Sequence, residues 1–322
     1  MAASGVPAVG QGRSVTFHSP EVALEQGLGA HRSGFHKMAE PGLTFAAESG
    51  SLLGRYYLAR LYADASGPLT DHAKAYKLYN GIYEEHATTI DVEDHPHARY
   101  VGKSLTALAV YMLRGLPVIG LKPNAVRAAE LLQEAATFFR DPDAQFELAK
   151  LYLTGDGVEV NHRKATSWLS TLTEGGHPGA QAFLADLYWR GKVLPRDENR
   201  ALALITLAVE NAPEHERIWI EDTYQSIYCG MAAGVRSQSD GLIASFRQRF
   251  SPRPGTEPQE ALGLGPRPVR ACADGTPLPA TRSDNRADDA SKLARTPAST
   301  PGMPRALQGG MLGISGGGAP QR

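Results

Sequence analysis

The chain has 322 residues, and its 33 Lys plus Arg nearly balance its 34 Asp plus Glu, for a formal net charge of −1. No basic stripe dominates any segment, which argues against a nucleic-acid partner. In the predicted helical region, residues 20–250, there is no phosphate-loop, GxSxG or HExxH motif, and the chain has no CxxC pair. The sequence therefore indicates neither an enzyme nor a structural zinc site.

The N-terminal residues 1–18 are predicted to be disordered. Residues 1–20 contain Arg13 as their only Lys or Arg, and they lack an apolar run of the length that a secretory signal needs. Taken alone, they predict a cytoplasmic protein. The longest apolar stretch, residues 201–209, is too short to cross a bilayer, so we expect no membrane-spanning segment.

A five-residue motif recurs along the chain and predicts a repeat protein. The motif Leu-Ala-x-Leu-Tyr begins at Leu58, Leu148 and Leu184, and the last two copies start 36 residues apart. A fourth copy begins at Leu108, with its Tyr one position earlier. A fixed period of roughly 20–50 residues is typical of solenoids, in which each unit contacts only its neighbours.

The residues around each motif follow one register. An Ala preceded by a base stands 17 positions after each leading Leu of the three clear copies, and an Asp or Asn that can cap a helix stands four positions before that Ala. The caps are Asp71, Asn161 and Asp197, and the bases are Lys74, Lys164 and Arg200. Gly115, Gly155 and Gly191 follow the first helix, where a left-handed turn suits a residue without Cβ. Each unit is therefore predicted to be a helix A, a tight turn and a helix B.

This register predicts an all-α fold, a right-handed α-solenoid of helix-turn-helix repeats. The predicted repeats span about residues 20–50, 51–86, 104–140, 143–178 and 179–212, and two helices in 213–250 are expected to cover the last one. The first repeat is expected to be degenerate, because Pro41-Gly42 should damage its second helix and terminal repeats are commonly atypical.

The C-terminal residues 251–322 are predicted to be a disordered tail. They contain no Phe, Trp or Tyr and eleven of the 22 prolines, so they cannot bury enough apolar surface to offset the entropy of ordering. The two cysteines are too few for a disulfide framework. Cys229 lies in an apolar helical context and is predicted to be a buried free thiol, whereas Cys272 lies in the tail and is predicted to be exposed.

A His- and acid-rich segment, residues 84–100, separates the first two clear repeats. Its His95 and His97, with carboxylates nearby, could bind a divalent metal or act as a pH switch. We favour a third interpretation, a solvated acidic loop that links two helices. The sequence predicts no bound metal and no cofactor.

In a stack of helical hairpins, the helix A residues that the core does not need line a concave face that can bind another protein. The register places five candidate residues there: Arg60, Lys150, Asp186, Trp189 and Arg190. For any single one of them, we favour the interpretation that it is an ordinary solvated side chain on a helix face. Trp189 is the strongest candidate, because exposed aromatic residues and Arg are enriched in binding hot spots.

The motif of residues 148–169, L-A-x-L-Y-x-x-G-x-G-V-x-x-N-x-x-K-A-x-x-W-L, resembles the Sel-one-like repeat, a tetratricopeptide-like helical hairpin. Over about residues 20–235 the chain resembles the ExoR family of exopolysaccharide production regulators of alphaproteobacteria. The features that carry this resemblance are Arg114-Gly115-Leu116-Pro117, residues 144–149 and Arg217-Ile218-Trp219-Ile220. The long tail is not part of that family's core.

The resemblance implies a non-enzymatic, periplasmic repressor. Such a protein binds a membrane sensor histidine kinase, holds its two-component pathway off and so restrains exopolysaccharide production. One alternative is a cytoplasmic scaffold or adaptor with a different protein client. A hydrolase, as in the cysteine-rich branch of the repeat family that resembles β-lactamases, is disfavoured because that branch staples its hairpins with paired cysteines.

Overall fold

The computed structural model describes residues 17–64, 67–93, 95–250, 271–273 and 278–279. These residues form thirteen α-helices, a short 3-10 turn at Pro117–Ile119 and no β-strand. In chain order the helices are α1 (Pro20–Arg32), α2 (His36–Glu48), α3 (Leu52–Ala63), α4 (His72–His86), α5 (Ala98–Arg114), α6 (Ala125–Thr137), α7 (Pro142–Thr154), α8 (His162–Glu174), α9 (Pro178–Arg190), α10 (Glu198–Asn211), α11 (Glu214–Gly230), α12 (Ala233–Gln238) and α13 (Asp240–Arg249).

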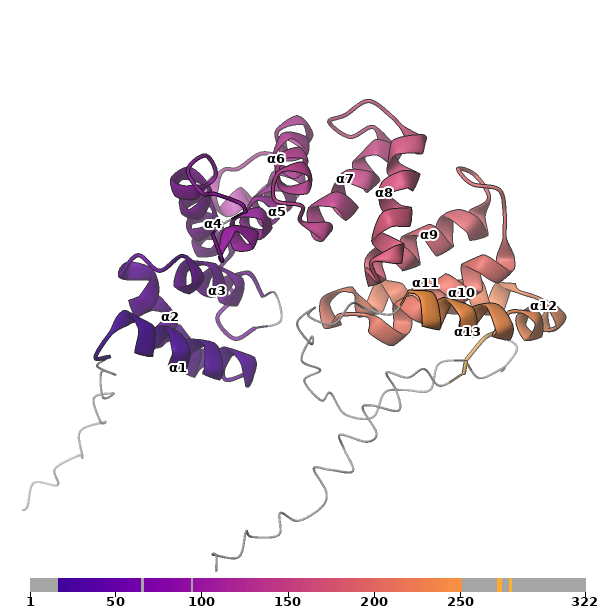
Figure 1. The fold of residues 1–322 in the computed structure, drawn as a ribbon, viewed down its shortest axis with the longest axis horizontal. Helices are drawn as coiled ribbons and strands as arrows, with labels where there is room; N and C mark the ends of the chain where they lie inside the picture. The colour runs from indigo at the N-terminus through magenta and orange to yellow at the C-terminus, as the bar shows by residue number, and fades with distance from the viewer. Residues whose placement is uncertain (1–16, 65–66, 94, 251–270, 274–277, 280–322) are drawn as a thin grey trace, which may run out of the picture.

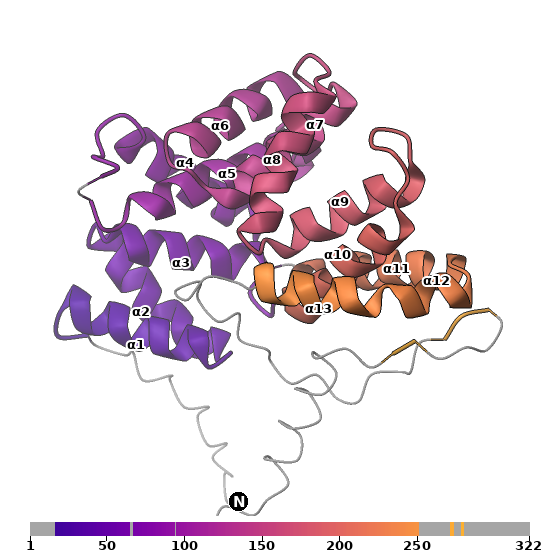
Figure 2. The ribbon, with the colours of Figure 1, turned by 45° about the vertical axis from the view of Figure 1, so that its right-hand side comes forward.

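Consecutive helices pack against each other as hairpins, and the hairpins stack into an arc (Figure 1). The helices α1–α3 form one end of the arc and α10–α13 the other, and the view in Figure 2 shows the same order along the stack. The predicted all-α solenoid is confirmed. None of the described helices is both long enough and apolar enough to cross a bilayer.

The turn inside each repeat is built by the residues that the register identified. The caps Asp71, Asn161 and Asp197 each accept a hydrogen bond from the backbone N–H three residues later, at 2.9–3.0 Å. The backbone N–H of each cap donates to the carbonyl of the helix A Tyr, at 2.8, 2.8 and 3.1 Å. Each cap therefore starts helix B and also ties it to the end of helix A, which fixes the hairpin angle.

The repeated base has a structural role that the spacing alone did not reveal. The charged groups of Lys74, Lys164 and Arg200 lie over the rings of Tyr62, Tyr152 and Tyr188, at 5.0, 4.3 and 5.1 Å from the ring centroids. Lys164 and Arg200 also donate hydrogen bonds to the phenol oxygens of their Tyr partners. Cation–π contacts of this kind stabilise the hairpin, and they engage the basic side chain with the Tyr ring of the same repeat.

The first hairpin corrects one sequence prediction. Helix α2 continues through Pro41 to Glu48 without a break, so the expected damage at Pro41-Gly42 is wrong. A Cβ at Gly42 would lie 2.6 Å from the carbonyl oxygen of Ala23. The glycine is therefore needed for the close approach of α1 and α2, whereas the degenerate character of the first repeat stays a prediction.

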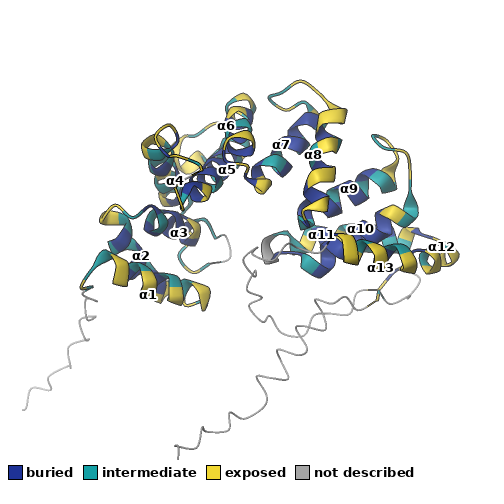
Figure 3. Cartoon of the chain, in the orientation of Figure 1, coloured by how far each residue is buried: buried dark blue, intermediate teal, exposed yellow. Residues whose placement is uncertain are grey.

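The core forms two apolar clusters along the arc. One extends from Ala39 to Ala165 and the other from Phe146 to the terminal helices, so α7 and α8 contribute to both. The small helix A residues Ala59, Ala109, Ala149 and Ala185 are fully buried, as close packing of helices requires. Figure 3 shows buried residues where consecutive helices meet and exposed ones on the outer sides of α1 and α13.

The cysteines correct a second prediction. Cys229 and Cys272 form a disulfide with their Cα atoms 5.4 Å apart, so neither is a free thiol, and Cys272 is buried rather than exposed. The predicted disordered segments, residues 1–18 and 251–322, lie almost wholly outside the described residues. The reason for the error is physical: residues 271–273 return to the helical domain, and composition does not record such a return.

Candidate protein-binding face

The first helices of successive repeats place equivalent residues in one row. Lys103 of α5, Asp143 of α7 and Gly179 of α9 occupy the same register position, and Lys150 of α7 is equivalent to Asp186 of α9. We call Lys103, Asp143, Lys150 and Asp186, together with Glu147 as the ion-pair partner of Lys150, the helix-A face, and all five are partly or fully exposed.

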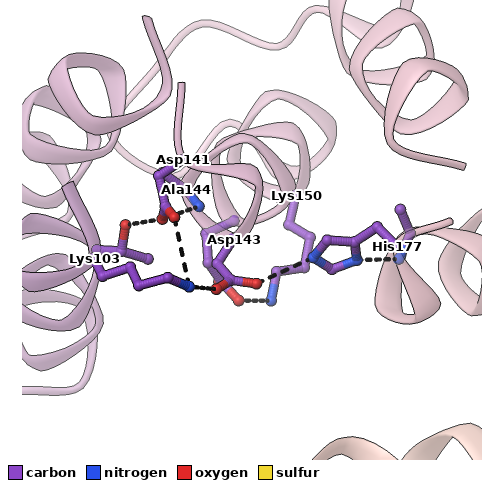
Figure 4. Close-up of polar contacts among 9 residues, drawn as sticks. Lys103, Asp141, Asp143, Ala144, Lys150 and His177 are labelled. Atoms are coloured by element: carbon purple, nitrogen blue, oxygen red, sulfur yellow. Dashed lines mark hydrogen bonds and ion pairs between the residues drawn. The ribbon is translucent and has the colours of Figure 1, made fainter. Parts of the chain in front are cut away.

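A network of charged side chains joins three repeats at the centre of this face. Lys103 Nζ lies 3.3 Å from Asp143 Oδ2 and 4.0 Å from Asp141 Oδ1, and His177 Nε2 lies 3.2 Å from Asp143 Oδ1. Figure 4 shows Lys103 and His177 approaching Asp143 from opposite sides. Together with Glu216, described below, these residues form what we call the junction cluster.

Asp141 is the buried member of the junction cluster. Its side chain is 4% exposed, and its Oδ2 accepts hydrogen bonds from the backbone N–H of Ala144 at 3.1 Å and from Thr106 Oγ1 at 2.6 Å. The first bond makes Asp141 the N-cap of α7, and the second fastens α7 to α5. Burial and the neighbouring Asp143 raise the pKa of Asp141, whereas Lys103 and the hydrogen bonds oppose that rise.

His177 connects the next repeat to this point. Its Nδ1 accepts a hydrogen bond from the backbone N–H of Ala180 at 3.1 Å and thereby caps α9. The proton of the neutral ring therefore resides on Nε2, which points to Asp143. One imidazole therefore fills two roles, as helix cap and as donor to the neighbouring repeat. Protonation of Nδ1 would remove the cap bond.

The pKa values of the cluster reflect these contacts. Burial opposes the ionisation of Asp143, but the His177 hydrogen bond and the Lys103 ammonium outweigh it, so the pKa of Asp143 is lowered. Burial disfavours the Lys103 cation, but Asp143, Tyr56 and Asp141 raise the pKa of Lys103 overall. Both groups are charged at neutral pH, and their side chains are 55% and 36% exposed, so a partner can reach them.

Glu216 brings helix α11 to the same cluster. A Cβ at Gly179 would lie 2.9 Å from Glu216 Oε1, so the absence of a side chain at Gly179 leaves room for this carboxyl group. Burial raises the pKa of Glu216, and His177 and Lys150 oppose the rise while Asp143 adds to it. The cluster therefore includes the start of a helix from the C-terminal cap.

The structure places the sequence-predicted residues in different environments. Lys150 lies in the helix-A face, where it forms an ion pair with Glu147 at 2.6 Å and lies over the ring of Phe146. Asp186 and Arg190 pair with each other at 2.7 Å. These three residues are partly or fully exposed on the predicted helices.

Trp189 is half-buried rather than exposed, and its role as a binding hot spot stays a prediction. Two neighbours cover its ring. Gly230 lies so close that a Cβ there would be 2.5 Å from the ring, and the guanidinium of Arg196 lies 4.6 Å from the ring centroid. The ring therefore packs between α9 and the end of α11. Its large apolar surface is used within the fold.

Arg60 belongs to the far end of the stack. It is exposed on α3, and its positive charge lowers the pKa of His31. Burial is the largest cause of that shift, followed by Arg60 and His36, and together they lower the pKa of His31 to about 4. The His31 ring packs against Tyr57 with centroids 5.6 Å apart. Arg60 and Lys150 therefore belong to two separate polar sites.

His95 and His97 lie in the turn between α4 and α5. The backbone N–H of His97 donates to His95 Nδ1 at 3.1 Å, and burial, His95 and Arg99 lower the pKa of His97. Among the described residues there is no group of three His, Cys, Asp or Glu side chains arranged to hold a metal ion. The described residues therefore give no support to the interpretation that His95 and His97 bind a divalent metal.

Sequence reasoning missed Lys103, Asp141, Asp143, His177 and Glu216. A local signal existed for two of them, because Asp141 and His177 each precede a Pro that begins a helix, which is a common N-cap arrangement. No local signal shows that the two caps meet at Asp143. The site offers paired charges and hydrogen-bonding groups at a partly exposed surface, which suits recognition of a polar protein surface.

Comparisons with known proteins agree with this architecture. The family model of the Sel1 repeat matches residues 53–80, 102–137, 142–177 and 178–212. The "Exopolysaccharide production negative regulator" of Rhizobium meliloti (strain 1021) is 31% identical over 222 residues, which cover 68% of this chain and 80% of the relative. The protein of that name from Rhizobium leguminosarum bv. viciae is 30% identical over 196 residues, or 61% and 70%.

Two solved structures share the fold. A Sel1 repeat protein from Oxalobacter formigenes superposes with a TM-score of 0.51 at 20% identity, covering 73% of this chain and 88% of that one. A protective antigen of uropathogenic Escherichia coli strains with an SLR fold gives a TM-score of 0.54 at 22% identity. That match covers 73% of this chain, which spans just under half (46%) of the antigen.

Proposed function

We propose that this chain, which belongs to the Sel1-repeat family of exopolysaccharide production negative regulators, is a protein-binding repressor that holds a membrane sensor histidine kinase in its inactive state. Through that kinase it restrains exopolysaccharide production. It acts by binding rather than by catalysis, and its partner contacts the helix-A face.

The observation that carries this proposal is the exposure of paired charges on three consecutive helices A. Lys103 and Asp143 are paired across two repeats yet remain partly open to solvent, and Lys150 and Asp186 extend the row. Charges held in place by neighbours lose little conformational entropy when a partner pairs with them. The same arrangement favours specific recognition and rapid association more than raw affinity.

The disulfide supports a periplasmic location for this repressor. Disulfides form and persist in oxidising compartments, including the bacterial periplasm, and are rare in the cytoplasm. Cys229 and Cys272 form one between α11 and residues 271–273. A periplasmic location also places the helix-A face on the side of the membrane where a sensor kinase exposes its sensing domain.

The test compares two variants that exchange the charges of an ion pair without removing it. The double variant Glu147→Lys/Lys150→Glu inverts the pair on the helix-A face, and Arg127→Glu/Glu130→Lys inverts a pair with the same spacing on helix B of the preceding repeat. Each tagged protein is expressed in its host with its upstream genomic sequence, and bound membrane proteins are identified by mass spectrometry after cross-linking.

We expect the wild type and the helix B control to recover a sensor histidine kinase, and the helix-A variant to recover at least tenfold less at an unchanged unfolding temperature. Equal recovery by all three proteins would contradict the assignment of the face. Recovery of a cytoplasmic client instead of a kinase, together with a reporter fusion active only in the cytoplasm, would favour the scaffold alternative.

A further inference from the structure

The disulfide joins two parts of the chain that are 43 residues apart in sequence. Cys229 lies near the end of α11, and the bond is accompanied by two further contacts of the described residues of the returning segment. One turn earlier on the same helix, Gln225 Nε2 donates to the carbonyl of Ala271 at 3.1 Å. Leu278 packs against the second apolar cluster. The segment therefore docks on α11 through polar, covalent and apolar contacts.

The two sulfur atoms differ in their surroundings. Cys272 is buried at 7% exposure, whereas Cys229 is only half-buried. Thiol–disulfide exchange requires a direct approach of a thiolate to one sulfur, so accessibility decides which one is attacked. Of the two residues Cys229 is the less buried, so its sulfur is the expected point of attack.

We propose that Cys229 and Cys272 form a reversible thiol–disulfide site that fastens residues 271–273 to α11 and is opened by a dithiol of the protein or small-molecule class. The dithiol's thiolate attacks Cys229 Sγ, the Cys229–Cys272 bond breaks, and Cys272 leaves as a thiolate that takes up a proton. The second thiol of the dithiol then attacks its own sulfur in the mixed disulfide and frees Cys229. One disulfide is reduced and one dithiol is oxidised.

Opening this site releases the segment and leaves the solenoid folded. Helix α11 is held independently by Ile220, Tyr224 and Ile227, which are 0%, 5% and 0% exposed within the second apolar cluster. Its end is held by the packing of Gly230 on Trp189. The covalent bond is thus the strongest tie on the returning segment but only one of many on the helix. This proposal concerns the fold and does not depend on a kinase partner.

The experiment uses the full-length chain isolated under oxidising conditions, with dithiothreitol as the dithiol. Thiol alkylation followed by mass spectrometry counts free cysteines, hydrogen exchange measures the amides of residues 271–273 and of α11, and circular dichroism measures helix content. The variants Cys272→Ser and Cys229→Ser/Cys272→Ser separate the loss of the bond from other effects of the reductant.

We expect no alkylation before reduction and two alkylated cysteines after it. Exchange in residues 271–273 should rise at least tenfold, with helix content and exchange in the buried half of α11 unchanged. Cys272→Ser should show the released state without reductant, and the double variant should not respond to reductant. Alkylation of both cysteines in the oxidised protein, unchanged exchange in 271–273, or unfolding of α11 on reduction would overturn the proposal.

Discussion

Asp141 allows the energy of the junction cluster to be separated from that of a simple helix cap. The substitution Asp141→Ala removes the N-cap of α7 and also the acceptor for Thr106 on α5. Asp197→Ala is its matched control, because Asp197 caps α10 through the same kind of bond to the N–H of Arg200 and its side chain is 39% exposed. Both variants lose a cap, but only the first loses a buried tie between repeats.

The expected magnitudes follow from these contacts. Loss of an N-cap costs about 1 kcal/mol, which is all that we expect for Asp197→Ala. A buried hydrogen bond to a charged group adds roughly 1.5–3 kcal/mol. Two effects reduce that addition, since Thr106 also donates to the carbonyl of Gly102 and the raised pKa of Asp141 reflects a burial cost that Ala does not incur. We therefore expect about 2–3 kcal/mol for Asp141→Ala.

Urea unfolding at pH 7, followed by circular dichroism, measures both variants against the wild type. A double-mutant cycle with Thr106→Val should give a coupling energy of about 1 kcal/mol between Thr106 and Asp141. Equal losses for Asp141→Ala and Asp197→Ala, or a coupling energy near zero, would show that the contact between α5 and α7 contributes nothing beyond the cap.

Two further predictions concern pH. The pKa of Glu216 is raised by burial, so the folded protein loses stability as pH rises through the range where the carboxyl group ionises; Glu216→Gln should therefore unfold at a higher temperature than the wild type at pH 7, and the gap should close at pH 4. A lower unfolding temperature for the variant at pH 7 would contradict this. Burial lowers the pKa of His31 from 6.5 to about 4, so the unfolded chain binds more protons between these values and stability is lost as pH falls from 6.5 to 4. Partial exposure of the ring limits that loss to about 1–2 kcal/mol, and urea unfolding of His31→Gln should show a smaller fall over this range; an unchanged fall would exclude His31 as its source.

The repeat fold could be predicted because its signals are local. Asp71, Asn161 and Asp197 cap helices through bonds to residues three positions away, and Gly155 and Gly191 end helices with positive φ, so each hairpin is encoded within its own repeat. Pro41 misled the prediction because α2 continues through it, and the reason for Gly42, its close approach to Ala23, lies in another helix.

The candidate site could be predicted only in part because it is assembled from several repeats. Lys150 and Asp186 were found because they share a register, whereas the pairing of Lys103 with Asp143 depends on how two repeats stack. Trp189 is half-buried because α11 turns back over it, and Cys272 is paired because a distant segment returns. Contacts of this kind leave no periodic trace in the sequence.

The two ends of the stack are not alike. The helices α11 and α13 cover α10, the last helix of the last repeat, whereas the α1–α2 end leaves Phe35 and Met38 with 60% and 71% of their surface exposed. The two ends of the arc therefore offer different surfaces to a second copy of the chain. Self-association through the apolar end would use the same patch on both subunits and would stop at a two-fold symmetric pair. The helices that complete the core at one end thus also make the two ends of the arc unequal as surfaces for a second copy.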